Sequence, residues 1–278
     1  MTRGADQYGV VGHPVAHSLS PFIQGWFARA TGQEMSYRLF DVVAESFRDW
    51  TRDFFVQGGR GLNVTLPHKM AAAEFAEDLT PRAIQAAAVN TLVARPDGIL
   101  GDNTDGAGLV RDLCDNEGLV VTRRRLLILG AGGATRGLLG PLLGLSPAEV
   151  VIANRTVERA AQLAAAFADL GPVLGVGFDE LDGKAFDLVV NATSASLSGE
   201  IPPIPPGTVG PETVCYDLAY GKSATAFVEW AERQGCMRAL QGLGMLVEQA
   251  AESFRLWRGV RPNTTEVRAV LKERTGTV

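Results

Sequence analysis

Residues 63–69, Asn-Val-Thr-Leu-Pro-His-Lys, combine a lysine with neighbouring polar groups and a chain turn. In an extended strand, side chains two positions apart share a face, so Asn63 and Thr65 are expected to point together while Leu66 points into a core. The proline ends the strand because it lacks an N–H, which leaves Lys69 at the strand exit. A lysine placed there can transfer a proton. Taken alone, the segment also suits a solvated lysine after a turn.

Two further segments carry polar groups that could bind a small molecule. Ser18 and Ser20 follow the first expected strand, and residues 102–106 contain the carboxylate of Asp105. Each has a simpler interpretation, because Ser20 before Pro21 has the residue types of a helix N-cap and first turn. Residues 102–106 likewise suit a turn that caps a helix. These interpretations stay open at the level of the single motif.

A glycine-rich loop follows the apolar run 126–129 and precedes a helical pattern. That order is typical of a dinucleotide site, where glycines allow close backbone approach and the helix N-terminus faces the pyrophosphate. The loop residues are Gly130, Ala131, Gly132, Gly133 and Ala134. Thr135 stands at the third glycine position of the fingerprint, so we expect the close strand–helix packing to rely on Gly133 and Ala134 or on a shifted register.

The end of the next expected strand indicates which dinucleotide is bound. Asn154, Arg155 and Thr156 stand where an NAD-binding unit carries an acidic residue for the ribose hydroxyls. A guanidinium with amide and hydroxyl donors suits a 2′-phosphate, so the sequence favours NADP over NAD. Residues 191–194 follow another apolar strand and are expected at the same sheet edge.

Composition excludes several classes of function. The chain has 278 residues, a formal net charge of -5 and no basic run, which argues against a nucleic-acid partner. No apolar run approaches the roughly 20 residues of a membrane span, and no signal peptide is visible. Three widely spaced cysteines and three histidines offer no metal-ligand spacing. We therefore expect a cytoplasmic protein without a metal.

Alternating strand and helix patterns predict an α/β fold in two domains. Apolar strands are expected near 126–129, 150–153, 188–190 and 214–218 of a parallel sheet covered on both faces. A second α/β unit is expected before residue 106, with strands near 8–11, 37–42 and 61–66 and a hairpin over 89–100. The apolar stripe of helix 243–257 is expected to pack against that unit. The predicted domains are 1–105 completed by 243–278, and a Rossmann-type domain over 106–242.

Taken together, these segments resemble the shikimate dehydrogenase family along essentially the whole chain. The matching segments are 12–21, 63–69, 89–92, 103–105, 130–134, 154–156, 191–194, 220–222 and 241–249. Two places depart from the family pattern. Gln24 and Gly25 stand where the family usually has His and Asn, and Ala88 replaces a glycine.

The resemblance implies a role for each matching residue. Lys69 and Asp105 would be the catalytic pair. With Lys69 in that role, we expect His68 to brace the turn before it. The implied substrate-binding residues are Ser18, Ser20, Thr65, Asn90, Tyr220 and Gln249. The implied cofactor-binding residues are Gly130, Ala131, Gly132, Gly133, Ala134, Asn154, Arg155, Thr156, Thr193, Leu218 and Gly242.

The implied reaction is the reversible reduction of 3-dehydroshikimate to shikimate by NADPH, in the pathway to chorismate and aromatic amino acids. Lys69 would supply the proton, and the two serines would bind the substrate carboxylate. A related alternative is a quinate/shikimate dehydrogenase that uses NAD, against which Ser20 and Arg155 weigh. A non-catalytic dinucleotide-binding regulator needs neither Lys69 nor Asp105. The choice between monomer and homodimer stays open.

Overall fold

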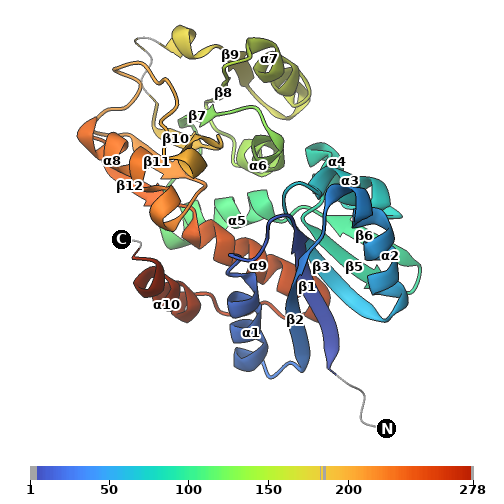
Figure 1. The fold of residues 1–278 in the computed structure, drawn as a ribbon. Coiled ribbons are helices and arrows are strands. Elements are labelled where there is room, and N and C mark those ends of the chain that lie inside the picture. The colour runs from blue at the N-terminus through green and yellow to red at the C-terminus, as the bar shows by residue number, and fades with distance from the viewer. Residues whose placement is uncertain (1–4, 182, 184–185, 277–278) are drawn as a thin grey trace. The chain divides into compact units, whose positions relative to one another are not determined.

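The computed structural model describes residues 5–181, 183 and 186–276. The chain forms two compact units (Figure 1). The first unit contains the chain up to Gly108 together with Val247–Val267. The second unit contains Leu109–Leu246 together with the chain from Arg268 onward. Each unit has its own six-stranded sheet.

The sheet of the first unit is mixed. Its strand order is β2-β1-β3-β5-β6-β4. β1 is parallel to β2 and β3, whereas β5 runs antiparallel to β3 and β6. The bounds are β1 (Asp6–Gly12), β2 (Met35–Asp41), β3 (Gly59–Val64), β4 (Asp78–Leu79), β5 (Thr91–Arg95) and β6 (Gly98–Asp102). β5 and β6 form the predicted hairpin.

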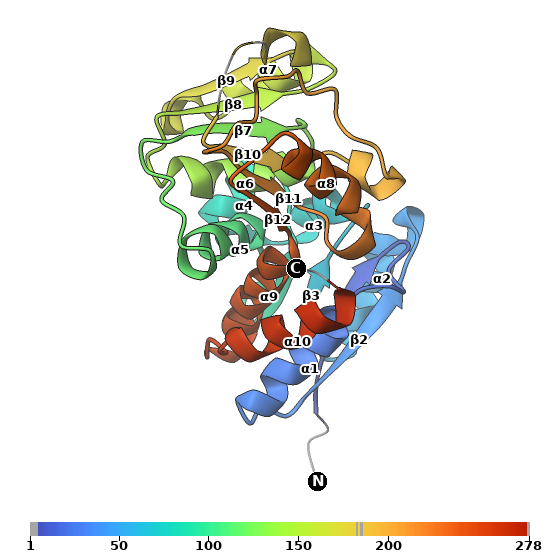
Figure 2. The ribbon, with the colours of Figure 1, turned by 90° about the vertical axis from the view of Figure 1, so that its left-hand side faces the viewer.

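Helices cover both faces of this sheet. They are α1 (Ser20–Ala30), α2 (Phe47–Val56), α3 (Lys69–Phe75), α4 (Pro81–Ala86) and the part of α9 (Leu243–Arg258) from Val247 on. α1 and α9 lie side by side (Figures 1 and 2), and the Phe27 and Phe254 rings are 5.8 Å apart. The Trp257 indole of α9 donates to the carbonyl of Leu92 at 3.0 Å. The prediction that the C-terminal helix returns to the N-terminal unit is confirmed.

The strand expected over 61–66 ends two residues early, at Val64. Val64 lies in the core beside Leu62, as the alternation predicts, but the Leu66 side chain is 67% exposed rather than buried. The reason is local, because the carbonyl of Thr65 already accepts the amide N–H of His68 in a turn. A residue inside that turn cannot follow the strand alternation.

The sheet of the second unit is entirely parallel, with the order β12-β11-β10-β7-β8-β9. The bounds are β7 (Arg125–Leu129), β8 (Glu149–Ala153), β9 (Val173–Val176), β10 (Leu188–Asn191), β11 (Val214–Asp217) and β12 (Arg238–Gln241). The strand order reverses between β7 and β10, which is the Rossmann topology. In such sheets ligands bind beyond the carboxyl ends of the strands at this reversal.

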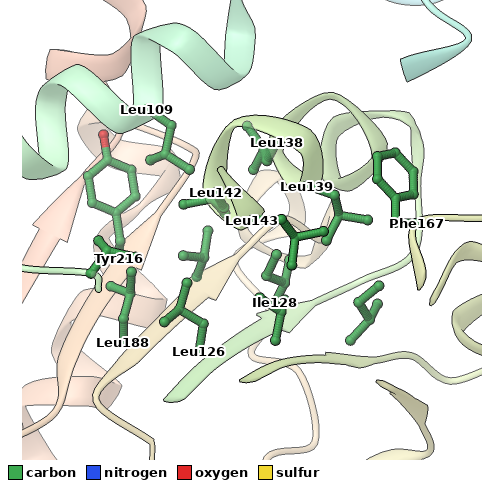
Figure 3. Packing of buried hydrophobic residues seen from close by; sticks show 14 of the residues in the cluster. Leu109, Leu126, Ile128, Leu138, Leu139, Leu142, Leu143, Phe167, Leu188 and Tyr216 are labelled. Atoms are coloured by element: carbon green, nitrogen blue, oxygen red, sulfur yellow. The ribbon is translucent and has the colours of Figure 1, made fainter. Parts of the chain in front are cut away.

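Both faces of the second sheet are covered, as the apolar runs predicted. Leu126 and Ile128 of β7 pack with α6 (Gly133–Leu143), as Figure 3 shows. α5 (Asp105–Arg111) and α7 (Val157–Ala165) contribute to the same cluster. Leu127 and Leu129 point to the other face and pack with α8 (Thr225–Arg233).

Several elements were not predicted from the pattern. β4 has two residues, and β9 and β12 lie at the edges of their sheet, where short, half-buried strands carry little apolar signal. Helix α10 (Thr265–Thr275) was also missed. Residues 243–278 were expected to belong together, but the chain from Arg268 on clusters with the second unit. There Arg268 and Lys272 line a small cavity with the carboxylates of Asp112 and Glu117, so opposite charges favour this placement.

Candidate active site

Lys69 and Asp105 form an ion pair in the first unit. Lys69 begins α3 just after the turn that ends β3, and Asp105 begins α5 just after β6. Their atoms Nζ and Oδ2 lie 2.5 Å apart, and both side chains are largely buried. The structure thus brings together two residues that the sequence linked only through the family resemblance.

Asn90 fixes the other oxygen of Asp105. Its Nδ2 donates to Asp105 Oδ1 at 2.7 Å, and its Oδ1 accepts the backbone N–H of Thr104 at 2.9 Å. The backbone N–H of Asp105 donates to Asn103 Oδ1 at 3.1 Å. Buried polar groups held at each end in this way have one orientation. Asn90 therefore orients the carboxylate of Asp105.

Gln249 lies at the edge of the same cluster, and Thr65 lies four residues before Lys69. Gln249, on α9, has its Oε1 3.4 Å from both Asn90 Nδ2 and Thr104 Oγ1. Thr65 is half-buried at the exit of β3, where its backbone N–H donates to the carbonyl of Val11. The side chains of Gln249 and Thr65 are both candidates for binding a ligand that reaches Lys69.

Ser18 and Ser20 lie before and at the start of α1. Ser18 Oγ donates to Ser20 Oγ at 3.1 Å and accepts the backbone N–H of Ser20 at 3.2 Å. Ser20 is not the N-cap, because the helix begins at Ser20 and the capping position is Leu19, which makes no side-chain cap bond. The capping alternative for Ser20 is therefore wrong. Its hydroxyl is instead hydrogen-bonded with the hydroxyls of Ser18 and Tyr37.

Sequence reasoning missed Tyr37 and Ser253, which link the serines to the catalytic pair. The Tyr37 hydroxyl donates to Asn63 Oδ1 at 2.7 Å, and Asn63 Nδ2 donates to Ser253 Oγ at 2.9 Å. Burial raises the pKa of Tyr37 well above its usual value, although a hydrogen bond with Ser20 lowers it. Tyr37 is therefore a neutral donor. The spacing of Ser253 one helical turn after Gln249 was a signal that could have found it.

His68 supports the turn, as we expected from its position beside Lys69. Its side chain is 2% exposed, its Nε2 lies 2.6 Å from the carbonyl oxygen of Val42, and its ring stacks on Phe47 at 4.6 Å. Burial lowers the pKa of His68, while the Val42 carbonyl raises it. A buried neutral imidazole with this contact holds the chain in front of Lys69.

Gln24 and Ala88, at the two departures, each make one hydrogen bond, although the buried Oε1 of Gln24 has no partner among the described residues. Gln24 is buried in α1, and its Nε2 donates to the carbonyl of Ala250 in α9 at 3.1 Å. Ala88 is buried and its carbonyl accepts Asn103 Nδ2 at 3.1 Å. Gly25 follows Gln24 in α1, where a side chain would meet only Arg29 within 4 Å. None of these positions removes a contact of the Lys69 pair.

The glycine loop of the second unit has room for a phosphate. Gly130 has φ +100, and a Cβ on Gly132 or Gly133 would meet nothing within 4 Å. Gly133 opens α6, so the helix N-terminus lies beside this open space, as a pyrophosphate site requires. Ala131 donates its backbone N–H to Asn154 Oδ1 at 3.3 Å. These residues fit a dinucleotide.

Of the two alternatives for strand–helix packing in this loop, the one in which Gly133 and Ala134 provide the contact is wrong. Gly133 faces open space and Ala134 is only half-buried, so neither forms the close contact. Thr135 is itself fully buried, and its Oγ1 donates to the carbonyl of Gly130 at 2.7 Å. The threonine is tolerated at the third glycine position because its hydroxyl satisfies a backbone carbonyl of the loop.

Asn154, Arg155 and Thr156 follow β8. Asn154 Nδ2 donates to the carbonyl of Thr156 at 2.9 Å, which fixes the turn, while Arg155 and Thr156 are exposed. Arg155 lines an open pocket of about 510 Å³ with Gly177, Phe178 and five other residues. A guanidinium in this position suits a phosphate monoester at the ribose.

The other predicted cofactor residues lie at the carboxyl ends of β10, β11 and β12. Thr193 Oγ1 donates to Asn191 Oδ1 at 2.7 Å, and Asn191 Nδ2 donates to Asp217 Oδ2 at 3.1 Å. Leu218 follows Asp217, and a Cβ on Gly242 would lie 2.2 Å from the Leu218 carbonyl oxygen, so only glycine fits there. Asn191 lies in the segment 191–194 that was expected at this sheet edge. Asp217 was not predicted as a site residue, although buried polar groups at strand ends are a signal for such sites.

Tyr220 belongs to the second unit, unlike the other predicted substrate-binding residues. Burial raises the pKa of its hydroxyl, so the phenol is neutral. Its contact with the substrate stays a prediction.

The described residues offer neither a metal cluster nor a membrane-spanning helix. Among them, no group of three or more His, Cys, Asp or Glu side chains could hold a metal ion. Within the same part of the chain, every helix is too short or too polar to cross a membrane.

Three family models match the chain. Residues 10–92 match the shikimate dehydrogenase substrate binding domain, residues 113–198 match shikimate / quinate 5-dehydrogenase, and residues 242–272 match the shikimate 5'-dehydrogenase C-terminal domain.

Related proteins match nearly the whole chain. Shikimate dehydrogenase (NADP(+)) of Methylococcus capsulatus is 54% identical over 263 residues, 94% of each chain. The crystal structure of an Ael1 enzyme from Pseudomonas putida has a TM-score of 0.92 and 43% identity, over 96% of this chain and 98% of that one. Shikimate 5-dehydrogenase of Thermus thermophilus, in complex with NADP(H) and shikimate, has a TM-score of 0.85 and 32% identity, over 96% and 99%. The chain therefore belongs to the shikimate dehydrogenase family.

Proposed function

We infer that this protein catalyses the reversible, NADPH-dependent reduction of 3-dehydroshikimate to shikimate. The observation that carries the inference is the Lys69–Asp105 pair, held by Asn90 inside a continuous polar cluster. A non-catalytic dinucleotide-binding protein has no need of a lysine and a carboxylate fixed in this way. The family relationship over nearly the full chain supports the same reaction.

Lys69 is the proton donor in our proposal. As an ammonium it donates to the carbonyl oxygen of the substrate and stabilises the negative charge that develops there. Asp105 holds the ammonium in place and accepts from the hydroxyl that forms. In the reverse direction, neutral Lys69 takes the proton from the hydroxyl. NADPH supplies the hydride that reduces the carbonyl carbon.

The polar cluster matches a ring with one carboxylate and several hydroxyls. Ser18 and Ser20 provide hydroxyl donors for the carboxylate, while Thr65, Asn90 and Gln249 provide amide and hydroxyl groups for the ring hydroxyls. Tyr37 and Asn63 support this cluster, since they are hydrogen-bonded to each other. Tyr220 completes the proposed substrate contacts.

The second unit is the proposed NADP-binding domain, and the first is the substrate domain. Residues 130–134 would hold the pyrophosphate, and Arg155 with Asn154 and Thr156 would bind the 2′-phosphate. Thr193, Leu218 and Gly242 would hold the nicotinamide end. A place in chorismate and aromatic amino acid biosynthesis, a cytoplasmic location and a monomeric or homodimeric state complete the proposal.

An activity matrix tests this function. The purified protein is assayed with shikimate or quinate as substrate and NADP or NAD as cofactor. We expect the shikimate–NADP combination to be at least 100-fold more efficient than quinate–NAD, a difference of about 2.7 kcal/mol in transition-state stabilisation. No turnover with shikimate rejects the proposal. A preference for quinate with NAD replaces it with the activity of a quinate/shikimate dehydrogenase that uses NAD. Light scattering during size-exclusion chromatography gives the oligomeric state.

A further inference from the structure

Asp102 is a buried carboxylate beside the catalytic segment. Its side chain is 1% exposed at the end of β6, three residues before Asp105. Its Oδ1 accepts the Thr80 hydroxyl at 2.6 Å and the backbone N–H of Asn103 at 2.7 Å. Since the side chain of Asn103 in turn accepts the backbone N–H of Asp105, Asp102 anchors the turn that orients the Asp105 carboxylate.

The planar guanidinium of Arg82 binds both carboxylate oxygens of Asp102. Its Nε donates to Asp102 Oδ1 and its Nη2 to Asp102 Oδ2, both at 2.6 Å. The same Nη2 donates to Glu252 Oε1 on α9 at 3.2 Å. Glu252 lies three residues after Gln249 and one before Ser253, which both belong to the substrate cluster. Arg82 thus contacts the two segments that provide Asp105 and Gln249.

The surrounding charges show what is specific to Arg82. Arg255 and Arg261 also donate to Glu252, at 2.8 and 3.0 Å. Of these three guanidiniums, Arg82 is the one whose hydrogen bonds reach Asp102 as well as Glu252. Its side chain is 26% exposed, against 46% for Arg255. A point charge such as lysine cannot make the two parallel bonds to Asp102.

We propose that Arg82 is a positioning residue for the reaction. It holds the Asp102–Asp105 turn and the Gln249 turn of α9 in fixed positions relative to each other. The inference rests on the reaction proposed above. Misplacement of a catalytic group by about 1 Å lowers rates by up to about 100-fold. Arg82 acts on kcat through Asp105 and on substrate binding through Gln249, without touching the substrate itself.

Arg82→Met and Arg255→Met form a matched pair of variants. Both remove one guanidinium from Glu252, but only Arg82→Met removes the paired hydrogen bonds to Asp102. At a temperature where both variants are folded by circular dichroism, we expect Arg82→Met to lower kcat about 10- to 100-fold. Arg255→Met keeps kcat within about twofold. Equal losses of kcat in the two variants, or none in Arg82→Met, overturn the proposal.

Two further variants separate positioning from folding. Arg82→Lys keeps the positive charge. Relative to Arg82→Met, it is expected to restore more of the stability than of kcat. In an Asp105→Asn background, Arg82→Met should lower kcat less than about threefold, because residues that act through one another are not additive. A full additional loss in that background shows that Arg82 does not act through Asp105.

Amide hydrogen exchange gives a readout that does not depend on the reaction. The backbone N–H groups of Asn103 and Asp105 should exchange at least about tenfold faster in Arg82→Met than in the parent and in Arg255→Met. Unchanged exchange at both amides overturns the proposal even if activity falls. If the parent protein does not turn over shikimate, the proposed reaction fails, while faster exchange still establishes the positioning contact.

Discussion

Asp105 is held through both of its carboxylate oxygens, one by Lys69 Nζ at 2.5 Å and the other by Asn90 Nδ2 at 2.7 Å. The ammonium that we assign to proton transfer is therefore fixed by a carboxylate that cannot rotate without breaking a second hydrogen bond. This arrangement favours one position of Nζ and makes the reaction sensitive to each of the three residues.

Replacing Lys69 tests the proton donor. Lys69→Met should lower kcat by about 10²- to 10⁴-fold, because a positioned acid–base group contributes about this factor. The KM for shikimate should change little, since the polar cluster remains. Steady-state kinetics measure both constants. Lys272→Met, on the exposed side of α10, is the control and should keep the parent rate. A rate close to the parent in Lys69→Met removes Lys69 from the mechanism.

Replacing Asn90 tests the orientation of Asp105. Asn90→Leu keeps the branched shape of the side chain but leaves Asp105 Oδ1 and the backbone N–H of Thr104 without their side-chain partner. A buried polar group left unsatisfied costs about 1–3 kcal/mol, which should appear in urea unfolding. We also expect kcat to fall at least tenfold as Asp105 gains freedom. Loss of stability with an unchanged kcat assigns Asn90 to folding alone.

Replacing Arg155 tests the choice of cofactor. Arg155→Met should raise the KM for NADP about tenfold or more and leave the KM for NAD nearly unchanged, because only NADP carries the 2′-phosphate. Arg159→Met, one helical turn further on, is the matched control and should change the KM for NADP less than threefold. Equal losses with the two cofactors contradict the assignment of Arg155.

Thr135 tests the unexpected support of the glycine loop. Thr135→Val keeps the shape of the side chain but removes the hydrogen bond to the carbonyl of Gly130. The buried carbonyl then lacks this partner, so we expect a loss of about 1–3 kcal/mol in stability and weaker NADP binding. Thr135→Gly, which restores the usual fingerprint residue, should also destabilise the protein, since it leaves a cavity inside a helix. Gains in stability for either variant show that the hydroxyl contributes nothing.

Acid stability should depend on Glu252. Burial by itself raises the pKa of Glu252, but hydrogen bonds from Arg255 and the charge of Arg82 outweigh it and bring the pKa from 4.5 to about 2. A carboxyl with a lowered folded-state pKa stabilises the protein above its unfolded pKa, and this contribution is lost as the pH falls towards 2. Urea unfolding at several pH values should show Glu252→Gln less stable than the parent at pH 7. The difference, about 3 kcal/mol from this shift, should narrow between pH 5 and pH 2. A constant difference over that range contradicts the assignment.

The sequence determined much of this protein by local rules. Apolar runs and their alternation predicted the parallel sheet of the second unit, and the order strand, glycine loop, helix predicted the dinucleotide site. The segments that resemble the family pointed to Lys69, Asp105 and Arg155. Local chemistry is enough for the parallel sheet and the glycine loop, because each depends on residues that are close together in the chain, whereas Lys69 and Asp105 needed the resemblance over the whole chain.

The tertiary structure decided which polar side chains meet. Ser253 and Glu252 on α9 reach Asn63 and Arg82 from distant parts of the chain, and no local pattern specifies such pairs. Thr135 at a glycine position and Ser20 outside the N-cap each contradicted an expectation from the motif. The physical reason is that buried hydrogen bonds are satisfied by whatever the fold brings near. Burial and partner are therefore properties of the packed chain and not of the motif.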